Sequence, residues 1–219
     1  MTTDCKARPI LRASLVLAVG LLSAAGLMLA STPAQAVSFD LASDHCSAGC
    51  GTPPFGTVTV TQNGANVDIT MALLNGNLFA KTGSADNQAF KFNAVGVTLL
   101  DITIDAHLPQ ILVADSGAFN GDGTGQFGFG IICTSCGPGG STAFGGNIIF
   151  HVANATIADL TAPNNLGYIF VADILAPNGS TGPVAASSVP EPGTLALLGT
   201  GLVGLGYSAR RRWFGGVNG

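Results

Sequence analysis

The chain has 219 residues, of which 47% are hydrophobic and only 9% are charged. Its formal net charge is −4 at pH 7. An acidic surface repels phosphate backbones, so composition excludes nucleic acid as a partner and leaves divalent cations or neutral glycans as better-matched ligands.

Residues 1–36 have the layout of a secretory signal peptide. Basic residues precede an apolar stretch at 13–30, and Ala34 and Ala36 place small side chains where a signal peptidase reads them. We predict cleavage after Ala36, which makes Val37 the mature N-terminus. An uncleaved membrane helix is the alternative, and the small-residue site argues against it.

Residues 37–178 show the two-residue alternation of strands with one covered face. The expected strands are 57–60, 67–71, 90–92, 95–97, 102–104, 127–131, 148–152 and 168–174. Asn-Gly, Asp-Gly and Pro-Asn steps between them are typical of turns. Short strands at this spacing predict an all-β fold, a single antiparallel β-sandwich or jelly-roll domain. Residues 179–188 are small and lack periodicity, which predicts a flexible linker.

Four cysteines remain after signal-peptide removal, in two close pairs: Cys46 with Cys50, and Cys133 with Cys136. In an exported protein an even number of cysteines indicates disulfides. Three connectivities are open, and bridges within each pair are slightly favoured because each pair lies in an expected loop or hairpin. The alternative is a zinc site, since two short loops with four cysteines match a tetrahedral thiolate centre.

No catalytic signature is present in the body of the chain. None of the three histidines, His45, His107 and His151, stands in a catalytic pattern, and no serine lies in a Gly-x-Ser-x-Gly elbow. Asp101 and Asp105 would share one face of a continuous strand, where solvated aspartates are common. We therefore expect no enzymatic activity.

A weak calcium site is predicted in the glycine-rich loop 120–125. Asn120 and Asp122 offer oxygen ligands on a flexible backbone, but the loop lacks the full twelve-residue calcium hand. The competing interpretation is a simple hairpin loop. Apart from this calcium no cofactor is predicted, and no catalytic residue is assigned.

The C-terminal segment, residues 189–213, has three parts. The sequence Pro190-Glu191-Pro192 is followed by an apolar run at 195–207 and by the basic cluster Arg210, Arg211 and Arg212. An apolar helix of this length reaches about 20 Å, against a hydrocarbon core of about 30 Å. We expect a short transmembrane helix that anchors the chain transiently, with the arginines on the cytoplasmic side.

This layout resembles the PEP-CTERM sorting signal of bacterial surface proteins, which an exosortase-type membrane protease-transpeptidase processes. The resemblance covers residues 189–213 and says nothing about the activity of the domain. It implies recognition at Pro190, Glu191 and Pro192, loss of the tail after a transient stay in the inner membrane, and delivery to the outer surface or extracellular matrix. An ordinary tail anchor is the alternative.

These features together predict an exported surface or biofilm-matrix protein with a structural or adhesive role. Its expected partners are signal peptidase, the exosortase-type enzyme and exopolysaccharide. The alternative is a glycan-binding module or a polysaccharide-processing enzyme in the same matrix. The absence of tryptophan from residues 37–189 argues against a sugar-stacking platform and favours the structural role.

Overall fold

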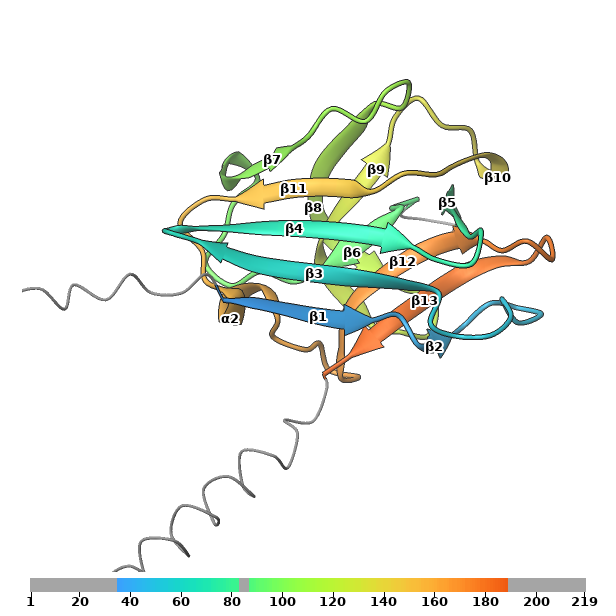
Figure 1. Cartoon of the computed structure of the whole chain (residues 1–219), viewed down its shortest axis with the longest axis horizontal. Coiled ribbons are helices and arrows are strands. Elements are labelled where there is room, and N and C mark those ends of the chain that lie inside the picture. Colours follow the sequence, from blue (N-terminus) through green and yellow to red (C-terminus); the bar gives the residue numbers. More distant parts are fainter. Residues whose placement is uncertain (1–34, 83–86, 189–219) are drawn as a thin grey trace, which may run out of the picture. The chain divides into compact units, whose positions relative to one another are not determined.

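A computed structural model describes residues 35–82 and 87–188. They form two antiparallel sheets packed face to face, with one short helix, α2 (Ile157–Leu160), and a 3-10 turn, η2 (Leu99–Asp101) (Figure 1). The predicted all-β sandwich is therefore confirmed. No helix within the described ranges has the length and apolar character needed to span a membrane, and the predicted C-terminal helix and most of the signal peptide fall outside them.

The first sheet has five strands. In spatial order they are β1 (Ala36–Asp40), β3 (Gly56–Asn63), β4 (Asn66–Leu73), β11 (Ile148–Val152) and β7 (Ile102–Ile104). The β3–β4 hairpin turns within two residues, and Gly64 there has a φ of 62°, which a glycine adopts at little cost. One face of each long strand is buried, as the alternating sequence predicts.

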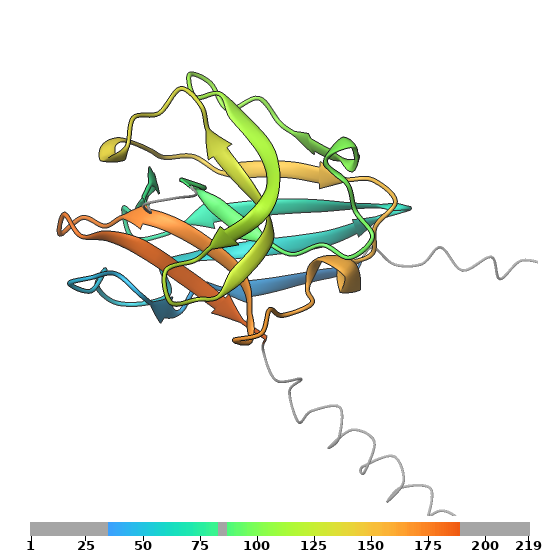
Figure 2. The same ribbon diagram turned by 180° about the vertical axis from the view of Figure 1, so that it is seen from behind.

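The second sheet is larger and more curved. Its main path runs β10 (Gly139–Phe144), β5 (Leu78–Lys81), β12 (Tyr168–Leu175), β6 (Phe90–Phe92), β9 (Gln126–Cys133) and β8 (Leu112–Asn120); β13 (Thr181–Ser187) pairs with β12 and with β2 (Ser43–Asp44). Figure 2 shows the β8–β9 hairpin, which forms one edge of this sheet, bending strongly. The ladder of this hairpin shifts register between Ser116 and Phe119, and such irregularities increase local bending.

Phenylalanine side chains join the two sheets. Phe150 of β11 lies 5.1 Å from Phe92 and 6.0 Å from Phe90, measured between ring centroids. Phe90 in turn stacks on Phe170 of β12 at 5.8 Å. All four rings are fully buried, so they form the centre of the core.

The expected strand at 95–97 is wrong. These residues form a bend in which Gly96 has a φ of 72°, and Val95 is 61% exposed. The positive φ of Gly96 interrupts the extended backbone. The segment Val95-Gly96-Val97 therefore does not pair with any described strand.

The flexible linker predicted at 179–188 is also wrong, because most of it is β13. Val184, Ala185 and Ala186 are buried, and the strand pairs with neighbours on both sides. Its small residues reflect close packing, since a Cβ on Gly182 would lie 2.7 Å from the Cα of Cys46. The folded domain therefore extends past 178 to Ser187.

Candidate functional site

One end of the sandwich holds the two termini of the described chain, and the opposite end holds three loops. Strand β1 begins and β13 ends in the half that holds α2 (Figure 1). The β4–β5 turn, the β12–β13 turn and the segment between β2 and β3 lie at the opposite end. These three loops are therefore distant from both termini of the described chain.

Both cysteine pairs form local disulfides, Cys46–Cys50 and Cys133–Cys136. The favoured connectivity is confirmed and the zinc alternative is wrong, because bridged sulfurs are not thiolate ligands. Asp44 lies close to the first bridge, but its two carboxylate oxygens accept the backbone N–H groups of Cys46 and Cys50 at 2.9 and 2.8 Å. This carboxylate therefore stabilises the disulfide loop.

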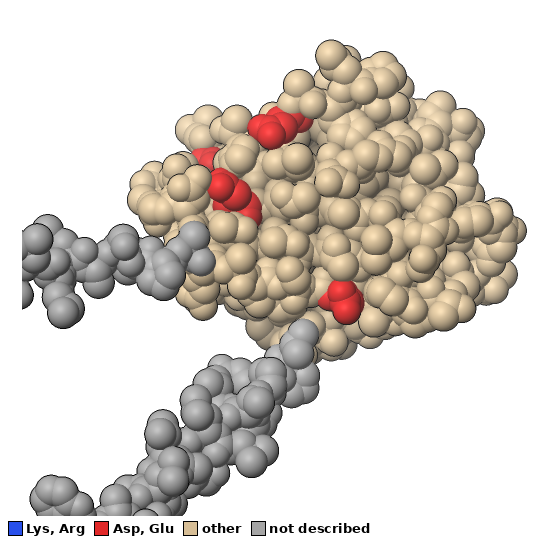
Figure 3. Space-filling view, viewed as in Figure 1, with Lys and Arg blue, Asp and Glu red and all other residues tan. Residues whose placement is uncertain are grey.

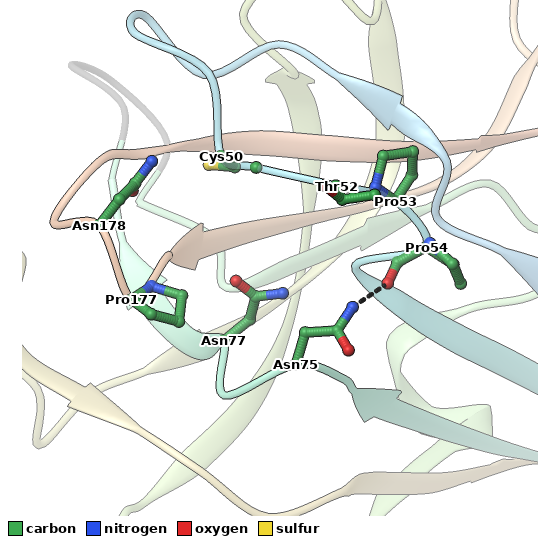
Figure 4. Close-up of a pocket in the computed structure, with 9 residues that line it drawn as sticks. Cys50, Thr52, Pro53, Pro54, Asn75, Asn77, Pro177 and Asn178 are labelled. Atoms are coloured by element: carbon green, nitrogen blue, oxygen red, sulfur yellow. Dashed lines mark hydrogen bonds between the residues drawn. The ribbon is translucent and has the colours of Figure 1, made fainter.

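The disulfide loop forms one wall of a pocket of about 550 Å³ (Figure 4). Residues 50–54 line one side, Asn75 and Asn77 of the β4–β5 turn another, and residues 177–178 of the β12–β13 turn the third. No lining residue carries an ionisable side chain that is free to titrate, because Cys50 is in a disulfide. The sequence did not reveal this pocket, since its three segments are far apart along the chain.

A second cluster lies on the outer face of the first sheet, around His151. Its Nδ1 lies 2.7 Å from Asp68 Oδ1, and its Nε2 lies 3.2 Å from Asp105 Oδ1. Two carboxylate partners require both ring nitrogens to donate, which favours the imidazolium form. The hydrogen bond to Asp68 is the main cause that raises the pKa of His151, and the same bond is the main cause that lowers the pKa of Asp68.

This cluster predicts a pH dependence of stability. The raised pKa of His151 contributes stability that is complete below its ordinary value of 6.5 and is lost as pH rises through the folded-state pKa. The lowered pKa of Asp68 contributes stability above its ordinary value of 3.8 that is lost as pH falls through the folded-state pKa. The stabilisation by this pair is therefore largest between pH 3.8 and 6.5.

The measurement is urea unfolding of the native protein and of His151→Gln across this range. We expect the native protein to gain stability over the variant between these two pKa values and to lose that advantage above neutral pH. The effect is modest, because the His151 side chain is 41% exposed. An advantage that grows above neutral pH would contradict the pairing. His45→Gln is a comparison variant at a histidine with no ion-pair partner among the described residues.

Asp101 and Asp105 do not share a strand face as expected. Asp101 lies in η2, where its Oδ2 accepts bonds from the backbone N–H and hydroxyl of Thr98 at 2.9 and 2.7 Å, while Asp105 follows β7 and contacts His151. These bonds to Thr98 lower the pKa of Asp101. Asp101 therefore caps a turn and is not part of a carboxylate pair.

A third cluster combines Ser43, His45 and Tyr168. Ser43 Oγ lies 2.9 Å from His45 Nε2 and 3.3 Å from Tyr168 Oη, and Nε2 lies 3.1 Å from the same Oη. A serine beside an imidazole supplies the nucleophile and the base of a catalytic triad, which also needs an acidic residue. Within the described residues, however, no acidic side chain pairs with His45, whose Nδ1 faces Gly123. The cluster joins β2 to β12, and sequence reasoning missed it because Tyr168 is distant along the chain.

His107, the remaining histidine, lines a second pocket of about 570 Å³ between the loop 106–110 and residues 143–147. Its ring packs edge-on against Phe144 at 5.2 Å. Its Nδ1 is buried and has no hydrogen-bond partner among the described residues, so the contact with Phe144 is what places the ring.

The predicted calcium loop closes the β8–β9 hairpin. The Thr124 hydroxyl donates to the carbonyl of Gly121 at 2.7 Å, and Asn164 donates to the Thr124 carbonyl at 2.7 Å. The loop is thus an ordered turn, as the competing interpretation expected. Calcium binding by Asn120 and Asp122 stays a prediction.

Charged side chains are sparse on the domain. Figure 3 shows a few separate acidic patches and no lysine or arginine on the face it presents. Lys91 is instead buried in the second sheet, where its Nζ lies 2.8 Å from Asp173 Oδ2. This ion pair is structural, because both side chains are only 1% exposed.

The fold and these sites define an acidic, disulfide-bonded β-sandwich. Comparison with known families finds the PEP-CTERM protein-sorting motif at residues 188–212. The chain therefore carries this sorting motif, which confirms the resemblance at Pro190, Glu191 and Pro192 and at the arginine cluster, although these residues lie outside the described part of the chain. Neither curated proteins nor solved structures gave a match.

Proposed function

We propose that the chain is a surface or extracellular-matrix protein whose β-sandwich has a structural or adhesive role. The observation that carries this proposal is the sorting motif at residues 188–212, which implies export, processing by an exosortase-type enzyme and direction to the cell surface. Two disulfides are in keeping with an oxidising compartment. Exopolysaccharide is the proposed matrix partner, and a non-enzymatic role is part of the proposal.

The second candidate function is a glycan-binding module in the same matrix. The uncharged pocket at the loop end of the sandwich favours it, because neutral sugars need hydrogen-bonding side chains without a counter-charge. A polysaccharide-processing enzyme would need two carboxyl groups placed across the scissile bond. Asp68 and Asp105 instead both bind His151.

Deleting residues 190–213 tests the surface delivery that the proposed role requires. We expect the deleted protein to be exported but absent from the surface fraction, because the sorting enzyme has nothing to recognise. Deleting 214–219 leaves the motif intact and is the matched control, which should reach the surface normally. Unchanged surface delivery of the 190–213 deletion would overturn the proposal.

A further inference from the structure

We propose that the pocket bounded by residues 50–54, Asn75, Asn77 and residues 177–178 binds a neutral saccharide, with Asn77 Oδ1 accepting a hydrogen bond from a sugar hydroxyl. This rests on the second candidate function and names its site and ligand class. The pocket belongs to the folded domain, so saccharide binding and surface delivery can fail independently of each other.

The orientation of the Asn77 amide is fixed by its nitrogen. Nδ2 donates to the carbonyls of Leu74 and Phe55 at 2.8 and 3.2 Å, and only the nitrogen end of an amide can make both bonds. Oδ1 must therefore face the other way. Figure 4 shows it on the side of Cys50, in the space enclosed by the lining residues.

This oxygen is an acceptor that lacks a donor. Asn77 is 6% exposed, and its Oδ1 is buried with no hydrogen-bond partner among the residues that the structure describes. Buried polar atoms are normally paired, because an unpaired acceptor loses its bonds to water without replacement. A donor supplied from the pocket would satisfy it.

The rest of the lining selects for an uncharged ligand. Its polar groups are the Thr52 hydroxyl and three asparagine amides, and its apolar surface comes from three prolines: Pro53, Pro54 and Pro177. The lining has no cationic side chain that would bind an anion. It also offers no free carboxylate to a metal ion, because both oxygens of the nearby Asp44 accept backbone N–H groups. A sugar offers both hydroxyl donors and C–H faces, and the cavity of about 550 Å³ is of the size that binds small ligands.

The three loops are held in place before any ligand arrives. Asn75 Nδ2 donates to the Pro54 carbonyl at 3.0 Å, and Asn178 Nδ2 donates to the Gly49 carbonyl at 3.1 Å. The Cys46–Cys50 bridge constrains the same wall. Binding then orders little additional chain, which favours affinity.

The test is a two-dimensional NMR titration of the intact chain, exported from its expression host so that both disulfides form. The probes are neutral mono- and disaccharides of the gluco, galacto and manno series at millimolar concentration. We expect saturable shifts in the side-chain amide signals of Asn77 and in the backbone signals of Gly51, Asn75 and Asn178. Overturning results are an absence of saturable shifts with every sugar, shifts confined to another surface, or a response only to uncharged peptides.

A steric variant adds a second, independent readout. Thr52 is exposed at the pocket rim, and Thr52→Met would fill the cavity without removing any described side-chain hydrogen bond. We expect affinity for the responding saccharide to fall by about tenfold or more. Thr103 is an exposed threonine on β7 and lines neither described pocket, so Thr103→Met should bind normally. Equal affinities for the two variants would refute the assignment.

Discussion

Replacing Asp173 with alanine is expected to lower the free energy of unfolding by about 3–5 kcal/mol. Its partner Lys91 would then carry a positive charge in a site where both side chains are 1% exposed and the two charged atoms are 2.8 Å apart. A buried charge that loses its counter-charge costs far more than a surface pair contributes. Guanidinium unfolding at neutral pH measures the difference.

Two further variants separate burial of charge from loss of packing. Asp40→Ala removes an exposed aspartate at the end of β1 and should change stability by about 0.5 kcal/mol or less. The double variant Lys91→Met/Asp173→Leu should recover most of the stability lost in Asp173→Ala, because neither charge is left unpaired. A loss below about 1 kcal/mol for Asp173→Ala would contradict the buried pair.

Replacing Phe150 with alanine is expected to cost about 3–5 kcal/mol, since it leaves a cavity between the two sheets. The ring is fully buried and contacts Phe90 and Phe92 across the sandwich. The same chemical-denaturation measurement applies, with thermal unfolding as a second readout.

The matched control for the core is the neighbouring residue. Ile149 lies on the same strand but is only partly buried and points to the opposite face. Ile149→Ala should therefore cost much less than Phe150→Ala. Similar losses for the two variants would mean that the inward and outward faces of β11 are assigned the wrong way round.

Strands were predicted best from the sequence where only one of their faces is buried. The alternation at 57–60 and 67–71 identified β3 and β4, because their outward residues are polar and their inward residues apolar. At 148–152 the run of β-formers identified β11, although its outward face carries Ile149 beside His151. Where both faces are covered, that signal disappears. β13 is buried on both faces and built from small residues, so its composition was mistaken for that of a linker.

The sites were less predictable than the fold, because each is assembled from distant segments. His151 could be placed on a strand, but its contacts with Asp68 and Asp105 depend on the pairing of β11 with β4 and β7. The pocket around Asn77 likewise requires three loops to meet at one end of the sandwich. By contrast, the local disulfides and the sorting motif are continuous in the sequence and were predicted correctly.

The most direct test of the central claim is the intact mass of the native protein recovered from the cell surface, before and after reduction. We predict a chain that starts at Val37, which keeps the pairing of Val37 with Val60 in β1, and that ends near Pro190. Reduction should add four hydrogens, two for each of the two disulfides. A surface protein that retains Arg210–Arg212, or one with four free thiols, would contradict the account of an exported, sorted and disulfide-bonded domain.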